Sequence, residues 1–216
     1  MNFEWLNKDS RKFLDAGYLK EDQTPEERIR EIADTAEKIL GIEGFGDKFY
    51  DYMGKGYYSL SSPVWANFGN DRGLPISCNG VYIADEISSI LNKASEVGTQ
   101  TKYGAGTSGY FGDIRPRGSK IWTGGVADGP VHFMNIFETM TDVISQGTTR
   151  RGAFAGYLNI DHPDIMEFLE IREPGAEIQN ISLGITIPDE WMQSMIDGDT
   201  DKRNIWAAVL RKRKET

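Results

Sequence analysis

The sequence has few of the residues that metal sites and disulfides need, and it has no long apolar run. Its 216 residues include one cysteine, Cys78, and two histidines, His132 and His162. One cysteine cannot form an internal disulfide, and two distant histidines lack the spacing of a zinc site, so we expect no metal bound by this chain. No apolar run approaches the roughly 20 residues that span a bilayer, and no basic flank with an apolar block follows Met1. We therefore expect a soluble, cytoplasmic protein without a membrane partner.

Positive charge is also scarce. The chain has 24 lysine and arginine residues against 33 aspartate and glutamate residues, which gives a formal net charge of -9. A general affinity for nucleic acid requires a basic face that releases counterions from phosphates. The dense basic run at residues 211–214 is better interpreted as a solvated helix end. We therefore expect no nucleic-acid partner.

The first part of the chain has helical signals. Thr24-Pro25-Glu26-Glu27 has the pattern of a capping box with proline at the first helical position, and apolar residues then recur at helical spacing up to Gly41. A second, short helix is expected over residues 47–55. The sequence therefore predicts a helical region over residues 1–56.

From Tyr57 onward, apolar runs broken by Gly, Pro and Asn alternate with amphipathic segments. This alternation is typical of an α/β domain, which we expect over residues 57–216. The expected strands are 81–83, 110–114, 153–159 and 181–186, and helices are expected to begin near Asp85, Val131, His162, Asp189 and Asp201.

Residues 104–109, Gly-Ala-Gly-Thr-Ser-Gly, formally match the dinucleotide-binding pattern G-x-G-x-x-G. That motif needs a strand before it and a helix after it. Residues 87–97, ahead of it, have a helical pattern, and residues 110–114, behind it, run into Arg115-Pro116. Close backbone packing, or the approach of another ligand, explains these glycines better than a dinucleotide site.

Two loops combine arginine with glycine, residues 114–119 and 146–152. Arginine binds phosphate through paired hydrogen bonds and stacks on bases, and glycine lets the backbone approach a ligand. The loops therefore suit nucleotide recognition, with solvent-facing arginines as the alternative.

Hydroxyl groups and the single thiol lie near prolines. Residues 59–62 crowd three serines before Pro63, which suits either a turn held by side-chain hydrogen bonds or a cradle for phosphate. Cys78 lies among the turn-forming residues 75–80, and this context favours an accessible thiol over a buried, inert one.

Taken in order, several motifs resemble the large (alpha, catalytic) subunit of class I ribonucleotide reductases. They are Ser61-Ser62-Pro63 with Pro75-Ile76-Ser77-Cys78, Gly106-Thr107-Ser108-Gly109 with residues 114–119, and residues 145–154. Several motifs in one order are more specific than any one of them. The resemblance implies a ten-stranded α/β reductase barrel, of which residues 57–216 would be the first, incomplete part, after a helical amino-terminal region.

The resemblance also implies roles for residues of the active site. Cys78 resembles the first of the two cysteines that reduce the substrate ribose and end as a disulfide. Ser77, beside it, and Ser62, before Pro63, resemble residues that line the ribose and diphosphate of the substrate.

Further positions resemble the family's site for the specificity effector. Asp85, or Glu86 if the register slips, resembles the acidic residue that accepts a hydrogen bond from the effector's hydroxyl group. Arg115 resembles a contact to the effector's phosphates in the first regulatory loop, which also contains Arg117. Residues 146–152 resemble the second regulatory loop, where Gln146 and Gly147 would contact the effector and Arg150 would report its identity to the substrate base.

The implied reaction is the reduction of a ribonucleotide by thiyl-radical chemistry, with loss of the 2′ hydroxyl group as water. The family's radical-bearing cysteine, its second redox cysteine and its carboxyl-terminal thiol pair would lie beyond Thr216, and there is no room before Thr24 for an ATP-cone domain. We therefore expect a partial catalytic subunit, active only with a complementary polypeptide that supplies the radical cysteine. A split gene and a truncation remain alternatives.

The resemblance implies partners as well. A separate metal-containing small subunit would generate the radical, thioredoxin or glutaredoxin would restore the thiols, and a deoxynucleoside triphosphate or ATP would be the effector. The chain itself would hold no cofactor. A different class of function stays open: a non-catalytic nucleotide-binding fragment that retains only the effector site.

Two predicted helices carry apolar stripes. In the resembled family such helices pair across a two-fold axis, so a homodimer of the assembled subunit is also expected. The alternative is that both stripes pack on this chain's own barrel. The stripes are Ile87, Ile90, Leu91, Ala94 and Val97, and Val131, Met134, Phe137, Val143 and Ile144.

Overall fold

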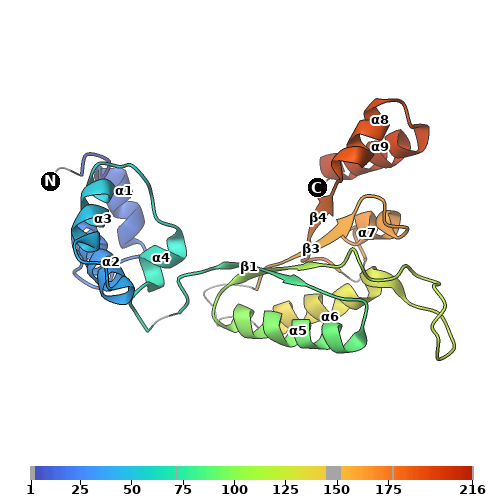
Figure 1. Ribbon diagram of the computed structural model, residues 1–216, viewed down its shortest axis with the longest axis horizontal. Coiled ribbons are helices and arrows are strands. Elements are labelled where there is room, and N and C mark those ends of the chain that lie inside the picture. The colour runs from blue at the N-terminus through green and yellow to red at the C-terminus, as the bar shows by residue number, and fades with distance from the viewer. Residues whose placement is uncertain (1–2, 72, 145–151, 177, 216) are drawn as a thin grey trace. The chain divides into compact units, whose positions relative to one another are not determined.

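The computed structural model describes residues 3–71, 73–144, 152–176 and 178–215 (Figure 1). The chain divides into two compact units, Met1–Ser77 and Cys78–Thr216, which are considered separately. The sequence pattern placed the change of texture at Tyr57. The first unit extends past that point because a short helix after Tyr57 packs with it.

The first unit consists of helices α1 (Lys8–Asp15), α2 (Pro25–Leu40), α3 (Phe45–Gly54) and α4 (Ser62–Asn67). The predicted start of α2 is confirmed: the Thr24 side chain accepts a hydrogen bond from the Glu27 backbone N–H, and the Glu27 carboxylate accepts one from the Thr24 backbone N–H. Gly41 ends α2 with a φ of 67°, a left-handed conformation that suits glycine. The core of the unit contains Leu6, Leu14, Ile29, Ile32, Met53 and Trp65.

Arg28 joins α4 to α2. Its side chain is 1% exposed, and its guanidinium donates to the backbone oxygens of Trp65 at 2.8 Å and Phe68 at 2.7 Å. These carbonyls belong to the last turn of α4, where no helical partner satisfies them. Arg28 also donates to the Glu31 carboxylate at 2.8 Å. A buried charge with this set of partners fixes α4 to the helical unit.

The second unit is an α/β structure, as predicted. Its strands β1 (Cys78–Tyr82), β2 (Gly106–Tyr110), β3 (Phe154–Asn159) and β4 (Ser182–Thr186) form one parallel sheet in the order β1-β2-β3-β4. Helices α5 (Ile87–Lys102), α6 (Gly129–Val143) and α7 (Ile165–Glu170) connect successive strands. Helices α8 (Asp189–Ile196) and α9 (Thr200–Glu215) follow β4 and pack on each other.

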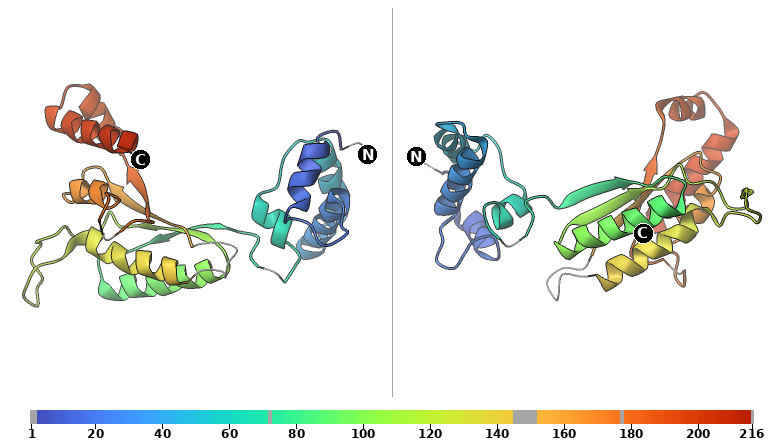
Figure 2. Two further views of the ribbon diagram at one scale, coloured as in Figure 1. Left: turned by 180° about the vertical axis from the view of Figure 1, so that it is seen from behind. Right: turned by 60° about the horizontal axis from the view of Figure 1, so that its bottom comes forward.

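The two faces of the sheet differ. Helices α5 and α6 lie side by side along one face, as Figures 1 and 2 show. The strand and helix side chains on this side form one core: Val81, Ile83, Phe111, Phe154, Leu158, Ile90, Val97, Met134, Phe137 and Phe168. On the opposite face of β1, Cys78, Gly80 and Tyr82 are exposed. Parallel strands in chain order, with the connecting helices on one face, are the repeating unit of an α/β barrel, whose interior corresponds to the open face.

The glycine-rich residues 104–109 do not form a dinucleotide loop. Helix α5 precedes them and most of them form β2, so this strand lies earlier than the predicted 110–114. A Cβ atom on Gly109 would lie 2.8 Å from the Phe154 ring and 2.9 Å from Ile83. Close backbone packing therefore explains this glycine.

Most of the predicted apolar stripe on α5 faces the core. Ile90, Ala94 and Val97 are buried, whereas Ile87 and Leu91 are 58% and 54% exposed. Packing on the chain's own sheet accounts for the buried residues. Of the stripe, only Ile87 and Leu91 remain available for a second protein surface.

Candidate functional site

The carboxyl ends of β1 and β2 border a hollow of about 640 Å³. Residues after β1, residues after β2 and residues of α6 line it together. They include Asp85, Ser88, Arg115, Trp122, His132 and Phe133. Ligands of parallel α/β folds bind outside the carboxyl ends of the strands, because the loops there converge.

Two of the residues predicted for an effector site meet in this hollow. The Arg115 Nε atom donates to Asp85 Oδ2 at 2.6 Å, and the Arg115 backbone N–H donates to Asp85 Oδ1 at 3.2 Å. The two side chains are 40% and 32% exposed, so the ion pair is open to solvent and to a ligand. Asp85 therefore supplies acceptors, and Arg115 supplies donors, at one wall of the hollow.

Glu86, the alternative acidic residue, also lines the hollow but has a different partner. Its Oε2 atom accepts from the Ser88 hydroxyl at 3.4 Å. The chain's geometry therefore joins Asp85, rather than Glu86, to Arg115. Helix α5 begins at Ile87, close to the start predicted near Asp85.

Arg117 points to the other side of its loop. Its guanidinium donates to both Glu167 carboxylate oxygens, at 3.0 and 2.5 Å, and hydrogen bonding to Glu167 raises the pKa of Arg117 above its ordinary value. Arg117 lines a neighbouring hollow of about 240 Å³ with residues of α6 and α7. Two arginines that are two positions apart in the sequence thus line different hollows.

Cys78 lies at the other end of the strands. It is the first residue of β1, is exposed, and lines a hollow of about 360 Å³ on the open face with Ser108, Ala155 and Ser182. Ser77 directly precedes it in the chain. Ser62, the other residue predicted to line the substrate, is the first residue of α4 in the helical unit. Gln146, Gly147 and Arg150 lie outside the described residues.

Sequence patterns did not single out Trp122, His132 and Phe133 as residues of the site. Trp122 is 94% exposed, and the turn that presents it contains Gly124 and Gly125, both with φ near +95°. The sequence signal that could have indicated Trp122 is a large aromatic residue in a glycine-rich loop. His132 and Phe133 reach the hollow only because α6 packs beside α5.

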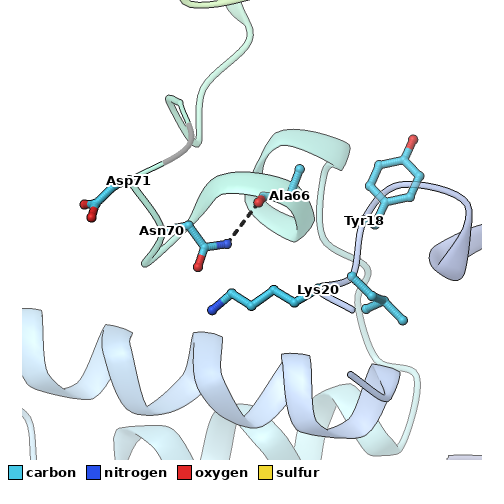
Figure 3. A pocket seen from close by; sticks show the side chains of 6 residues that line it. Tyr18, Lys20, Ala66, Asn70 and Asp71 are labelled. Carbon is cyan, nitrogen blue, oxygen red and sulfur yellow. Dashed lines mark hydrogen bonds between the residues drawn. The ribbon is translucent and has the colours of Figure 1, made fainter. Parts of the chain in front are cut away.

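A further hollow of about 410 Å³ lies in the helical unit, beside α4. Tyr18, Lys20, Ala66, Asn70 and Asp71 line it, and the Asn70 side chain donates to the Ala66 carbonyl at 3.1 Å (Figure 3). This hydrogen bond and the nearby Lys20–Glu31 ion pair belong to the packing of the unit.

Within the described residues, no three His, Cys, Asp or Glu side chains gather in a way that could hold a metal ion. Likewise, no helix there is long and apolar enough to cross a membrane.

The sheet order and the one-sided helices define this unit as part of an α/β barrel. Residues 76–204 match the family model of the ribonucleotide reductase barrel domain. The matched region is more than half of the chain, and the chain therefore belongs to the ribonucleotide reductase family.

Individual proteins agree with this family. The chain is 35% identical over 214 residues to a vitamin B12-dependent ribonucleoside-diphosphate reductase of Thermoplasma acidophilum, over 90% of this chain and 28% of that protein. It is 28% identical to a ribonucleoside-diphosphate reductase large subunit of invertebrate iridescent virus 6, over 92% of this chain and 22% of that protein. The solved class Id ribonucleotide reductase alpha subunit of Actinobacillus ureae is 54% identical, with a TM-score of 0.87, and the similarity covers 100% of this chain and 40% of that one. The chain thus spans well under half of each of these proteins.

Proposed function

We propose that this chain provides the first part of the catalytic barrel of a ribonucleoside-diphosphate reductase, with an effector site at one end of the strands and one redox thiol at the other. The observation that carries the proposal is the Asp85–Arg115 pair inside a hollow of about 640 Å³. The family match and the names of the relatives support the same activity. The relatives are much longer than the segment they share with this chain. Residues outside that segment, on this polypeptide or another, complete the reaction.

Cys78 is proposed as one thiol of the reducing pair. Its exposed position on the open face would direct it into the interior of a closed barrel. In the proposed reaction a thiyl radical removes the ribose 3′ hydrogen, and the 2′ hydroxyl group leaves as water. Two thiols supply the two electrons and become a disulfide, and the 3′ hydrogen returns to carbon. Ser77 and Ser62 are proposed to bind the ribose and diphosphate of the substrate, and thioredoxin or glutaredoxin to restore the thiols.

The radical source is proposed to be a separate metal-containing small subunit, in keeping with the likeness to a class Id alpha subunit. The vitamin B12-dependent relative supports a cobalamin as the second candidate. The roles proposed for this chain's own residues are to bind nucleotides and to reduce.

The effector is proposed to be a deoxynucleoside triphosphate or ATP, bound in the hollow beside Asp85. Asp85 would accept from a ribose hydroxyl group, and Arg115 would donate to phosphate oxygens. The two side chains bind each other in the structure, so ligand binding would exchange this contact for contacts to the nucleotide. Trp122 would offer the face of its ring to the base. Gln146, Gly147 and Arg150 remain proposed contacts of the second loop.

Calorimetric titration of the complete protein with TTP and with dATP tests the effector site. Asp85→Ala is expected to weaken binding by roughly 1–3 kcal/mol, because a charge-assisted hydrogen bond is lost. Asp142→Ala is the matched control, since Asp142 is an exposed carboxylate on α6 that does not line the hollow. Equal affinities of wild type and Asp85→Ala would show that the nucleotide, if bound, lies elsewhere.

Turnover separates the enzyme from the alternative, a non-catalytic nucleotide-binding fragment. With the rest of the subunit, the radical source and a reductant present, Cys78→Ser is expected to abolish deoxyribonucleotide formation while effector binding stays at the wild-type level. Wild-type turnover in the Cys78→Ser variant would remove Cys78 from the reaction. Nucleotide binding by a wild-type assembly that never turns over would favour the alternative.

A further inference from the structure

The loop that contains Arg115 and Arg117 is held from two sides. On one side Asp85 binds Arg115 through both its backbone N–H and its side chain. On the other side lies the turn between β3 and α7, which is residues 160–164. Three side chains in or just after this turn contact the loop, one at Ile114 and two at Arg117.

His162 makes the most buried of these contacts. The residue is 7% exposed. Its Nε2 atom lies 2.9 Å from the Ile114 carbonyl oxygen, and its Nδ1 atom accepts a hydrogen bond from the Asp164 backbone N–H at 3.0 Å. Because a carbonyl oxygen only accepts and a backbone N–H only donates, the ring satisfies both with its proton on Nε2. His162 thus joins the geometry of its own turn to Ile114, the residue directly before Arg115.

Asp164 makes the second contact, and the start of α6 packs against it. Its Oδ2 atom accepts from the Arg117 backbone N–H at 2.8 Å. A Cβ atom on Gly129, at the start of α6, would lie 2.6 Å from this carboxylate oxygen and 3.0 Å from the Arg117 nitrogen. Gly129 also has a φ of +80°. The glycine therefore leaves space for this hydrogen bond, and three segments of the chain meet there.

Glu167 makes the third contact, the paired hydrogen bonds to the Arg117 guanidinium. The side chains of this pair are 47% and 38% exposed, so the pair contributes little to stability. Its effect is directional, because it holds the Arg117 side chain on the α7 side of the loop. Arg115, two residues earlier, faces Asp85 and the larger hollow.

We propose that the turn centred on His162 and Asp164 is a positioning element for the effector hollow, and that Arg117 belongs to this element instead of contacting the nucleotide. The inference rests on the proposed effector site. The turn fixes the loop at Ile114 and at Arg117, and so fixes the direction in which Arg115 presents its guanidinium. His162 and Asp164 touch no ligand in this arrangement and act through Arg115.

The test is nucleotide affinity in the complete protein, measured by calorimetry with TTP and with dATP. His162→Leu is expected to weaken binding roughly tenfold, because the Ile114 carbonyl and the Asp164 N–H both lose a buried partner. His162→Gln keeps a donor where Nε2 lies and is expected to recover most of the affinity. Asp164→Ala should resemble His162→Leu, Asp164→Asn should stay close to wild type because an oxygen acceptor remains, and Glu167→Gln should change the affinity less than about twofold.

A variant that only lowers stability provides the matched control. Phe168→Leu alters a fully buried residue of α7 that makes no hydrogen bond to the loop, so it should lower the melting temperature and leave the affinity unchanged. If His162→Leu does not fold, the nucleotide affinities of Asp164→Ala and Asp164→Asn are compared instead, and this comparison tests the positioning role.

The outcomes separate this inference from the proposed function. No nucleotide binding by the wild type would overturn both. Binding that Asp85→Ala weakens, but that neither His162→Leu nor Asp164→Ala changes, would overturn the positioning role and leave the effector site intact. Equal losses in Asp164→Ala and Asp164→Asn, or a loss in Phe168→Leu as large as in His162→Leu, would show a merely structural role and would also overturn it.

Discussion

Arginine is used in opposite ways in the two units of this chain. In the helical unit, Arg28 is 1% exposed, and its guanidinium donates hydrogen bonds to backbone carbonyls and to one carboxylate. In the barrel unit, Arg115 is 40% exposed, and its partner Asp85 lines an open hollow. A guanidinium that is buried against partners of the fold stabilises the fold, whereas one that holds an exchangeable partner can bind a ligand. Burial and the nature of the partners therefore separate structural arginines from candidate binding arginines.

The largest expected effect on folding comes from Arg28. Arg28→Met leaves the carbonyls at the end of α4 without donors and Glu31 without its buried partner, and should lower the free energy of unfolding by about 3 kcal/mol or more. Denaturant unfolding followed by circular dichroism measures the loss. Arg30→Met, which removes an exposed arginine from the same helix, should cost less than about 1 kcal/mol. Similar losses in the two variants would mean that burial does not distinguish these arginines.

The ion pairs of Glu31 with Lys20 and Arg28 should also give the helical unit a pH dependence. Burial alone would raise the pKa of Glu31, but hydrogen bonds from Lys20, Gln23 and Arg28 outweigh it and lower that pKa from 4.5 to about 2. A lowered carboxylate pKa stabilises the fold above the unfolded value, and the stabilisation is lost as the pH falls from about 4.5 toward 2. The loss should be about 3 kcal/mol at most. Unfolding measured along this pH range should show a weaker slope in Glu31→Gln, and an unchanged slope would contradict the assignment.

A smaller effect, on binding instead of folding, is expected at Trp122. Since this side chain is 94% exposed, Trp122→Ala should leave the melting temperature nearly unchanged. It should weaken nucleotide binding by roughly 1–2 kcal/mol through loss of stacking on the base. Trp122→Phe, which keeps an aromatic ring, is the matched control and should lose less. A melting temperature that falls with Trp122→Ala would instead assign the ring to the fold.

The smallest expected effect on folding is at Leu91. Leu91→Glu adds a charge at a 54% exposed position, so the free energy of unfolding should change by less than about 0.5 kcal/mol. If the complete subunit forms the proposed homodimer through Ile87 and Leu91, the two-fold axis introduces the charge twice and should prevent association. Sedimentation with and without TTP measures this. A variant that still dimerises would place the interface elsewhere.

Local patterns predicted much of the fold. The capping box of α2 and the strands β3 and β4 were expected from local pattern. Asp85 and Arg115 were expected at one site through the family resemblance, but their direct ion pair was not. The position of β2 was wrong, because the packing of Gly109 against Phe154 and Ile83 decides it and local propensity does not.

Sequence patterns did not predict the contacts between residues that are distant in the chain. The direction of Arg117 depends on Glu167, which lies 50 residues further along the chain, and the end of the helical unit depends on Arg28 contacts to α4. Trp122 and His132 likewise line the hollow beside Asp85 only after the loop and α6 have folded beside α5. Such contacts form in three dimensions and have no local pattern.

The order of the strands has a consequence for handling the protein. Among the described strands, β1 is paired only with β2, and β4 only with β3, so each outer strand has one unpaired edge of backbone N–H and C=O groups. Unpaired edges recruit other strands, and a closed barrel avoids this hazard because it has no edges. Expressed without strands to cover β1 and β4, these residues should tend to self-associate through the sheet. Co-expression with the segment that completes the barrel is the natural remedy.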